Sequence, residues 1–184
     1  MLGRIARLRM ALSVATGVLL VNTGVAGTTY AATGFGFQPS ALLLWWCSNT
    51  SATDAITEQD INVGLGMAVS TTSRRCIGGQ SDHGALISAC DRVWRNDSVV
   101  ATLTILGATD GLADLQSFDA DGFTLVIDDQ FATAVRVNYL ALGGADLTNA
   151  AIIDITSPAA TGNQDYTSPG FQADAVFFIS ADEI

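Results

Sequence analysis

The residues best suited to catalysis surround His83, the only histidine in the chain. Ser81 lies two residues before it, and Asp82 and Asp91 are near in sequence. Hydrolysis by a nucleophile needs a hydroxyl, an imidazole base and an orienting carboxylate. On a strand, Ser81 and His83 would share one face, but such neighbours are badly aimed at each other, and the pattern G-x-S-x-G is absent. We therefore predict a polar loop histidine and no catalytic residue, with a Ser81/His83 hydrolase as the least favoured alternative.

A second candidate is the sequence Asp-Ala-Asp-Gly at residues 119–122, which resembles the start of a calcium-binding loop. The remaining ligands of an EF-hand, above all its terminal Glu, do not follow at the required spacing. Asp121 and Gly122 are also residues that a tight hairpin favours, because both accept positive φ. We predict a hairpin that leads into a strand at 123–127, with no metal and no cofactor. Calcium held by Asp pairs from different loops remains an alternative.

Three tryptophans, Trp45, Trp46 and Trp94, are the candidates for binding by stacking. Exposed indoles stack on sugar rings in lectin-like sandwiches, whereas buried ones fill cores and subunit interfaces. We favour core or interface packing. Together with Asp119 and Asp121, these tryptophans form the set of candidate ligand or interface residues.

The three cysteines, Cys47, Cys76 and Cys90, do not have metal-ligand spacing, because the chain has no CxxC pair and one histidine. The odd number leaves at least one thiol free. Each lies in or beside an apolar stretch, which predicts small buried hydrophobic residues. A Cys76–Cys90 disulfide is the alternative.

Composition narrows the function further. Charged residues make up 14% of the chain and apolar residues 49%, against roughly 25% charged in ordinary soluble domains. All eight basic residues are arginine, they are scattered, and the net charge is −10. Nucleic-acid binding needs a clustered basic footprint, so we exclude it. No apolar run approaches the ~20 residues of a membrane helix, so we expect no membrane partner. The balance favours a protein surface that neighbouring subunits cover.

Apolar residues recur with a period of two, which is typical of half-buried strands. The alternation is clearest at residues 99–105, 123–127 and 135–141. Turn residues such as Asp121-Gly122 and Gly143-Gly144 separate these runs, which predicts an all-β, antiparallel β-sandwich or jelly-roll-like fold. Residues 41–46 are apolar without alternation, which predicts a strand covered on both faces.

Residues 10–21 admit two interpretations. Arg4, Arg7 and Arg9 precede this apolar segment, and the small residues at 25–27 would suit a secretory cleavage site. The alternative is two strands, at 10–15 and 18–21. We favour the strands, because residues 17–23 have an interior counterpart at 151–157 that no cleaved peptide would need.

That counterpart belongs to an internal repeat with an offset of 134 residues. Five identities align residues 33–46 with 167–180: Thr33, Gly36, Phe37, Gln38 and Ala41 match Thr167, Gly170, Phe171, Gln172 and Ala175. A shared period this long indicates a duplicated unit rather than a solenoid. We predict a β-sandwich domain at 1–150, with 151–184 forming either the first strands of a second, truncated repeat or strands that complete the same sandwich.

Three phrases carry a resemblance to a known group of proteins. They are GFQPSALLLWW at 36–46, SFDADGFTL at 117–125 and YLALGG at 139–144. Together they resemble tailed-phage and prophage virion proteins, which combine "GF-x-P" before a hydrophobic strand with "SFD-x-DGFTL". The second copy departs from this pattern, with Ala173 in place of Pro39. The resemblance implies β-sandwich modules in tail or other virion components and transfers no catalytic residue.

The sequence therefore predicts a phage-type virion structural protein located in the virion, which assembles as a homo-oligomer or with other virion proteins. A carbohydrate- or receptor-binding module on the same fold is the alternative, with a surface glycan as ligand.

Overall fold

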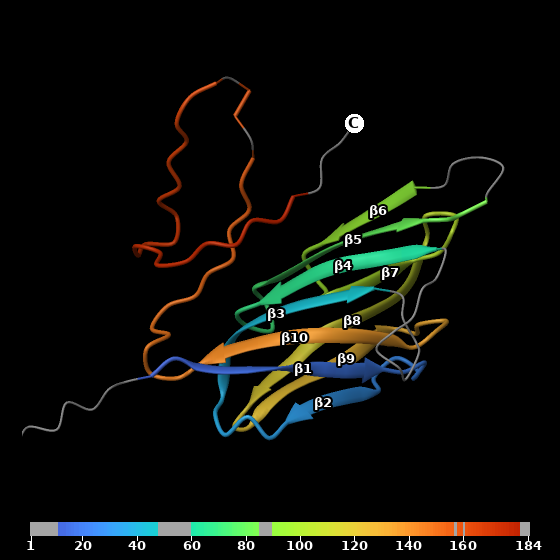
Figure 1. Ribbon diagram of the computed structural model, residues 1–184, viewed down its shortest axis with the longest axis horizontal. Coiled ribbons are helices and arrows are strands. Elements are labelled where there is room, and N and C mark those ends of the chain that lie inside the picture. Colours follow the sequence, from blue (N-terminus) through green and yellow to red (C-terminus); the bar gives the residue numbers. More distant parts are fainter. Residues whose placement is uncertain (1–10, 48–59, 85–89, 157, 160, 181–184) are drawn as a thin grey trace, which may run out of the picture.

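The chain folds into a sandwich of two antiparallel sheets, which confirms the all-β prediction (Figure 1). The computed structural model describes residues 11–47, 60–84, 90–156, 158–159 and 161–180. The six-stranded sheet consists, in spatial order, of β1 (Ser13–Val21), β10 (Val135–Gly143), β3 (Pro39–Cys47), β4 (Ile61–Ala68), β5 (Arg74–Ser81) and β6 (Cys90–Arg95). The four-stranded sheet consists of β2 (Thr29–Thr33), β9 (Gly122–Asp129), β8 (Thr109–Asp119) and β7 (Val100–Leu103).

The core lies between the sheets and is built from the alternating residues that the sequence indicates. Phe123, Leu125 and Ile127 of β9 are buried, as are Val137 and Ala141 of β10. Successive side chains of a strand point to opposite faces, so the residues between these face outward. The alternation predicted for both strands is confirmed.

β7 differs from its prediction at residues 99–105. The strand ends at Leu103, and Ile105 lies exposed in the turn that follows. All four residues of β7 are buried, including Thr102, whose hydroxyl lies 3.2 Å from an Asp110 carboxylate oxygen. This strand is buried more completely than alternation predicts, because it contacts β4, β5 and β6 of the facing sheet as well as its neighbour β8.

Two glycines of β4 leave room for neighbours that approach closely. A Cβ at Gly66 would lie 1.9 Å from the carbonyl oxygen of Val99, which precedes β7 of the facing sheet. A Cβ at Gly64 would lie 2.1 Å from the indole ring of Trp46 on the adjacent strand β3. Glycine within a strand allows such close approach, in one case by a backbone and in the other by a ring.

The N-terminal segment forms one strand where the sequence predicts two. β1 pairs with β10 without interruption from Ser13 to Val21, so the break expected between residues 15 and 18 is wrong. The ladder continues because Gly17 faces Tyr139, and a Cβ there would lie 2.4 Å from the phenol oxygen. Residues 1–10 lie outside the described residues, and they include Arg4, Arg7 and Arg9 of the possible secretory signal.

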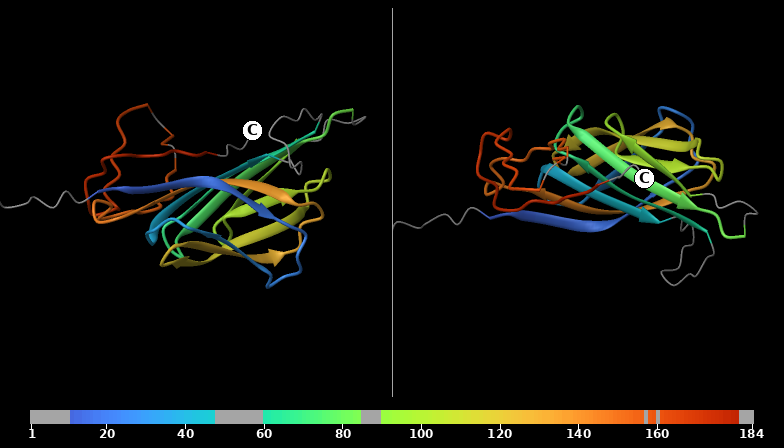
Figure 2. Two further views of the ribbon diagram at one scale, coloured as in Figure 1. Left: turned by 60° about the horizontal axis from the view of Figure 1, so that its bottom comes forward. Right: turned by 90° about the horizontal axis from the view of Figure 1, so that it is seen from above.

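After β10 the chain leaves the sandwich and extends beyond one end of it, as both views of Figure 2 show. The described residues between 144 and 180 contain no strand. The strands predicted within 151–184 are therefore not formed in this part of the chain, and the domain division stays a prediction.

Candidate functional site

The outer face of the six-stranded sheet, the side turned away from the four-stranded sheet, carries a largely apolar surface. The strand registers align one row of side chains across all six strands. In order from β1 to β6 the row consists of Val18, Asn138, Trp45, Leu65, Ile77 and Trp94. Isolated soluble domains rarely expose a contiguous apolar surface of more than a few hundred Å², and larger ones mark interaction sites.

The neighbouring tryptophans of β3 point to opposite sides of this sheet. Trp46 is 2% exposed and packs in the core, whereas Trp45 is 41% exposed on the outer face. Trp94 of β6 is 57% exposed on the same outer face. The prediction that residues 41–46 are covered on both faces therefore holds for the inner face. Among the described residues, the outer face around Trp45 stays accessible.

Continuous apolar character explains why the sequence does not separate these tryptophans. A run without polar residues has no alternation, so it does not reveal which positions point inward. The register of β10 supplies the missing signal, because Arg136 and Asn138 face outward and pair with Cys47 and Trp45. The phase of a buried strand can thus be read from its half-polar neighbour once the pairing is known.

The charged side chains that the six strands place on the outer face are all positive. Arg75, Arg92 and Arg136 project from β5, β6 and β10 beside the apolar row. The six strands contain a single acidic residue, Asp91, which is turned inward and accepts a 2.8 Å hydrogen bond from Gln80. In a chain of net charge −10, the six strands themselves thus place apolar side chains and arginines on the outer face and no carboxylate.

A wide, open hollow of about 570 Å³ lies on the outer face over β4, β5 and β6. Val63, Leu65, Ile77 and Arg92 line it, and Ser180 approaches it from the C-terminal segment. Its lining is almost wholly apolar, so it suits an apolar side chain better than a polar small molecule.

The C-terminal segment also contacts this face through an ion pair. Nε of Arg75 donates a 2.9 Å hydrogen bond to Oδ1 of Asp154, and Nη2 contacts Oδ2. This two-point contact raises the pKa of Arg75 and lowers the pKa of Asp154. The Asp154 side chain is 53% exposed, so solvent screens the pair, which orients the segment more than it stabilises the fold.

Asp119 and Asp121, the candidate calcium ligands, form hydrogen bonds within the fold. β8 ends at Asp119 and β9 begins at Gly122, which confirms the predicted hairpin. The Asp119 carboxylate accepts 2.7 Å hydrogen bonds from the hydroxyls of Ser117 and Thr124. Among the described residues, no group of three or more His, Cys, Asp or Glu side chains could hold a metal ion.

Asp121 binds the loop between β2 and β3. Its carboxylate accepts hydrogen bonds from the backbone N–H groups of Gly34 at 3.0 Å and Gly36 at 2.5 Å. Gln38 of the same loop donates a 2.8 Å bond to the carbonyl of Phe118. The phrases "GF-x-P" and "SFD-x-DGFTL" thus meet in space and form one structural unit, which sequence spacing alone does not reveal.

An aromatic cluster completes this unit. Phe35 stacks on Tyr139 with ring centroids 5.5 Å apart, and Phe123 meets the same tyrosine edge-on at 5.3 Å. Phe37 packs against Phe35 at 5.8 Å. Such offset and edge-to-face contacts stabilise aromatic pairs beyond the area they bury. All three resembling phrases therefore meet at this cluster.

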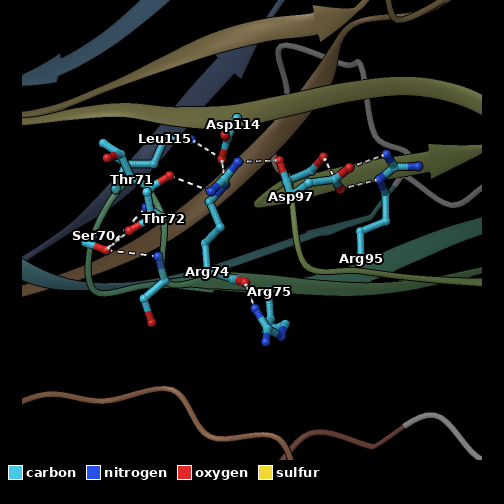
Figure 3. Close-up of polar contacts among 11 residues, drawn as sticks. Ser70, Thr71, Thr72, Arg74, Arg75, Arg95, Asp97, Asp114 and Leu115 are labelled. Atoms are coloured by element: carbon cyan, nitrogen blue, oxygen red, sulfur yellow. Dashed lines mark hydrogen bonds and ion pairs between the residues drawn. The ribbon is translucent and has the colours of Figure 1, made fainter.

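Figure 3 shows a cluster of charged residues that includes Arg74, Asp97 and Asp114. Nε of Arg74 lies 2.5 Å from Oδ1 of Asp114, and both side chains are largely buried. Arg95 forms a two-point contact with Asp97, at 2.8 and 2.7 Å. Burial raises the pKa of Asp114, whereas hydrogen bonds from Arg95 lower the pKa of Asp97. Each charge near the core has a partner, which is what burial of ionic groups requires.

Ser81 and His83 do not share a strand face. Ser81 is the last residue of β5, and His83 lies exposed in the turn that follows. The backbone N–H of His83 donates a 2.9 Å bond to Asp60, while the Ser81 hydroxyl lies 3.5 Å from the Cys90 sulfur. The predicted polar loop histidine is therefore confirmed, and the shared strand face that the hydrolase alternative would need is absent, because the strand ends between the two residues.

The cysteines are free, and only Cys76 is buried. Cys47 and Cys90 are exposed, so the prediction that all three are buried is wrong for these two. The alternation of β3 and β6 explains the difference, since both residues fall on outward positions. Burial raises the pKa of the Cys76 thiol to about 12.

No protein-family model, curated protein or solved structure matches this chain. The described residues include no helix long and apolar enough to cross a membrane. The fold and the site thus define an antiparallel β-sandwich with one exposed, apolar, arginine-bearing sheet face.

Proposed function

We propose that this protein is a structural subunit of a phage-type virion, in a tail or another appendage, and works through assembly rather than catalysis. Copies of the chain, or other virion proteins, cover the outer face of the six-stranded sheet. The observation that carries the proposal is the row of side chains from Val18 to Trp94 across that face, which is apolar at every position except Asn138.

Three features support this function over a freely dissolved enzyme. The apolar row is bordered by Arg75, Arg92 and Arg136, and arginine with aromatic residues is the composition that protein interfaces favour. The aspartates that could have bound calcium make internal hydrogen bonds. The resemblance to virion proteins rests on three phrases, and these form one structural unit.

The test is the molar mass in solution, measured by light scattering over a range of concentrations. We expect an oligomer, and we expect Leu65→Glu to dissociate it because the charge would lie at the centre of the covered surface. Leu106→Glu is the matched control, since Leu106 is exposed in the turn between β7 and β8, away from this face. Circular dichroism checks that both variants keep the fold. A wild-type chain that remains monomeric throughout, with and without other virion proteins, overturns the proposal.

The exposure of Trp45 and Trp94 favours one second candidate, binding of a surface glycan. The two indoles lie three strands apart in one row, or about 14 Å at the usual strand spacing. A flat platform of this kind suits stacking on a polysaccharide chain. Titration with oligosaccharides tests it: affinity that Trp94→Ala abolishes favours the glycan, and the absence of any affinity leaves the assembly proposal alone.

A further inference from the structure

We infer that residues 151–180 carry the counterparts of β1 and β3 of a second sandwich, and that a segment with the pattern of β10 binds between them. This inference does not rest on the proposed function, because it is argued from the repeat and the strand pairing, although Asp154 and Ser180 of the C-terminal segment contact the outer face. It starts from the 134-residue offset, which places residues 151–155 on β1 and 173–180 on β3.

The topology of the first sandwich explains why these residues form no strand. β1 and β3 do not pair with each other, because the sheet order is β1-β10-β3 and each of them pairs with β10. The segment carries the counterparts of β1, β2 and β3, and because β2 pairs with β9, none of the three has its hydrogen-bonding partner within the segment. The described residues between 144 and 180 are accordingly without strand.

The inward side chains of β1 and β3 differ in exposure from their counterparts in the C-terminal segment. Leu42 and Leu44 are each 1% exposed in β3, whereas their counterparts Val176 and Phe178 are 61% and 73% exposed. In the counterpart of β1, Ile153 and Ile155 fall on the inward positions of Leu19 and Val21. Asp154 falls on the outward position of Leu20, where a charge is tolerated. The pattern is that of two core-facing strands whose core is absent.

One residue before the second segment shares the backbone conformation of its counterpart in the first. Gly36 precedes β3 with a φ of 71°, and Gly170, its counterpart, has a φ of 74°. Positive φ is readily accessible only to glycine, so the match accounts for glycine at both positions. The rest of the turn differs, because Gly34 has a φ of 89° and its counterpart Ser168 does not have a positive φ.

The structure also defines the partner. Its inward residues should be apolar, as Val135, Val137 and Ala141 are in β10. It should differ from β10 at one point: Tyr139 fits against Gly17, where a Cβ would lie 2.4 Å from the phenol oxygen, and Ala151 stands at that position in the second segment. The partner strand should therefore carry a smaller residue opposite Ala151.

The test appends residues 51–143 of this chain after residue 184, which continues the 134-residue register. Ala151→Gly and Ser180→Trp match the two positions at which the appended copy needs Gly17 and Trp46. We expect the urea m-value to rise about twofold, because it scales with the surface that unfolding exposes. Backbone amides of residues 173–180 should gain hydrogen-exchange protection relative to the 184-residue chain.

Two further variants make the outcome decisive. In the extended chain, Phe178→Asp should abolish the second unit, whereas Phe177→Asp, on the outward position of Leu43, should leave it intact. A positive control replaces residues 151–180 by residues 17–46. If that control forms two units and the extended chain does not, or if the two aspartate variants behave alike, the inference is wrong.

Discussion

At the scale of single residues, Asp121 shows how one side chain can hold two distant parts of the chain together. Its carboxylate accepts the N–H groups of Gly34 and Gly36, more than eighty residues away. Hydrogen bonds to a charged group contribute more to stability than those between neutral groups. This role differs from the calcium site that the sequence pattern first suggests.

We expect Asp121→Ala to lower the free energy of unfolding by about 1–2 kcal/mol, with the loss moderated by solvent at this exposed site. Urea denaturation measures it. Asp129→Ala, an exposed aspartate at the other end of β9, is the control and should change stability little. Equal effects of the two substitutions would contradict the anchoring role.

The pKa values of Asp114 and Asp97 in the charged cluster should shift in opposite directions from that of an ordinary aspartate. Burial raises the pKa of Asp114, so the folded state binds more protons than the unfolded chain between its ordinary and its raised pKa. Stability from this group therefore falls as pH rises through that window. Arg95 lowers the pKa of Asp97, so its contribution is complete above the ordinary aspartate pKa and is lost as pH falls through the lowered one.

Carboxyl NMR titration checks both directions. Asp114 should titrate above the ordinary range of aspartate and Asp97 below it. Arg95→Gln should move the midpoint of Asp97 upward and leave Asp114 nearly unchanged, because Asp114 pairs with Arg74. Two aspartates that both titrate at the ordinary value would show that the cluster is not formed in solution.

At the scale of elements, the close approach of β4 to the residue before β7 depends on glycine. A side chain at Gly66 would meet the carbonyl of Val99, which is backbone and cannot rotate away. We expect Gly66→Ala to cost about 3 kcal/mol, at the upper end for overpacked sites. Gly79→Ala is the control, because its Cβ would lie 3.5 Å from the nearest atom, an ordinary contact. Thermal unfolding of both variants measures the difference.

The tryptophan pair of β3 gives a second prediction at this scale. Trp46→Ala should cost about 3–5 kcal/mol through loss of a buried ring. Trp46→Phe should cost much less, because it keeps most of the ring and removes the indole N–H, which has no hydrogen-bond partner among the described residues. Trp45→Ala should cost about 1 kcal/mol or less. If urea denaturation gave equal losses in the free energy of unfolding for Trp45→Ala and Trp46→Ala, both rings would have to be in the core, contrary to this prediction.

The strands themselves were largely predictable from alternation, and the exceptions have local causes. β9 and β10 alternate because each has one face in the core. β3 lacks alternation because the outer face of its sheet is apolar too. The break predicted within β1 is wrong because Gly17, read as an interruption, is needed for the ring of Tyr139. The pattern of β3 and the continuity of β1 both depend on the strands that they pair with, and a single sequence does not show which strands pair.

At the scale of the whole molecule, composition indicated a covered surface but not its location. Low charge and high apolar content describe the chain as a whole, whereas the structure gathers the exposed apolar side chains of β1, β3, β4 and β6 on one sheet face. The clustering follows from strand pairing between residues up to 130 positions apart, such as Ser13 with Gly143. The meeting of the three resembling phrases at one aromatic cluster depended on the same long-range pairing.

The reactivity of the exposed thiols of Cys47 and Cys90 should report whether the outer face is covered. Both lie on outward positions of the sheet that we propose is covered, while the third thiol, Cys76, is buried with a pKa of about 12. Thiolate is the reactive form, so Cys76 should resist alkylation until the chain unfolds. Dispersed chains should therefore react with maleimide at two sites per molecule, and assembled ones more slowly at both. Timed labelling read by mass spectrometry would reveal when that face is covered, without a mutation or an attached probe.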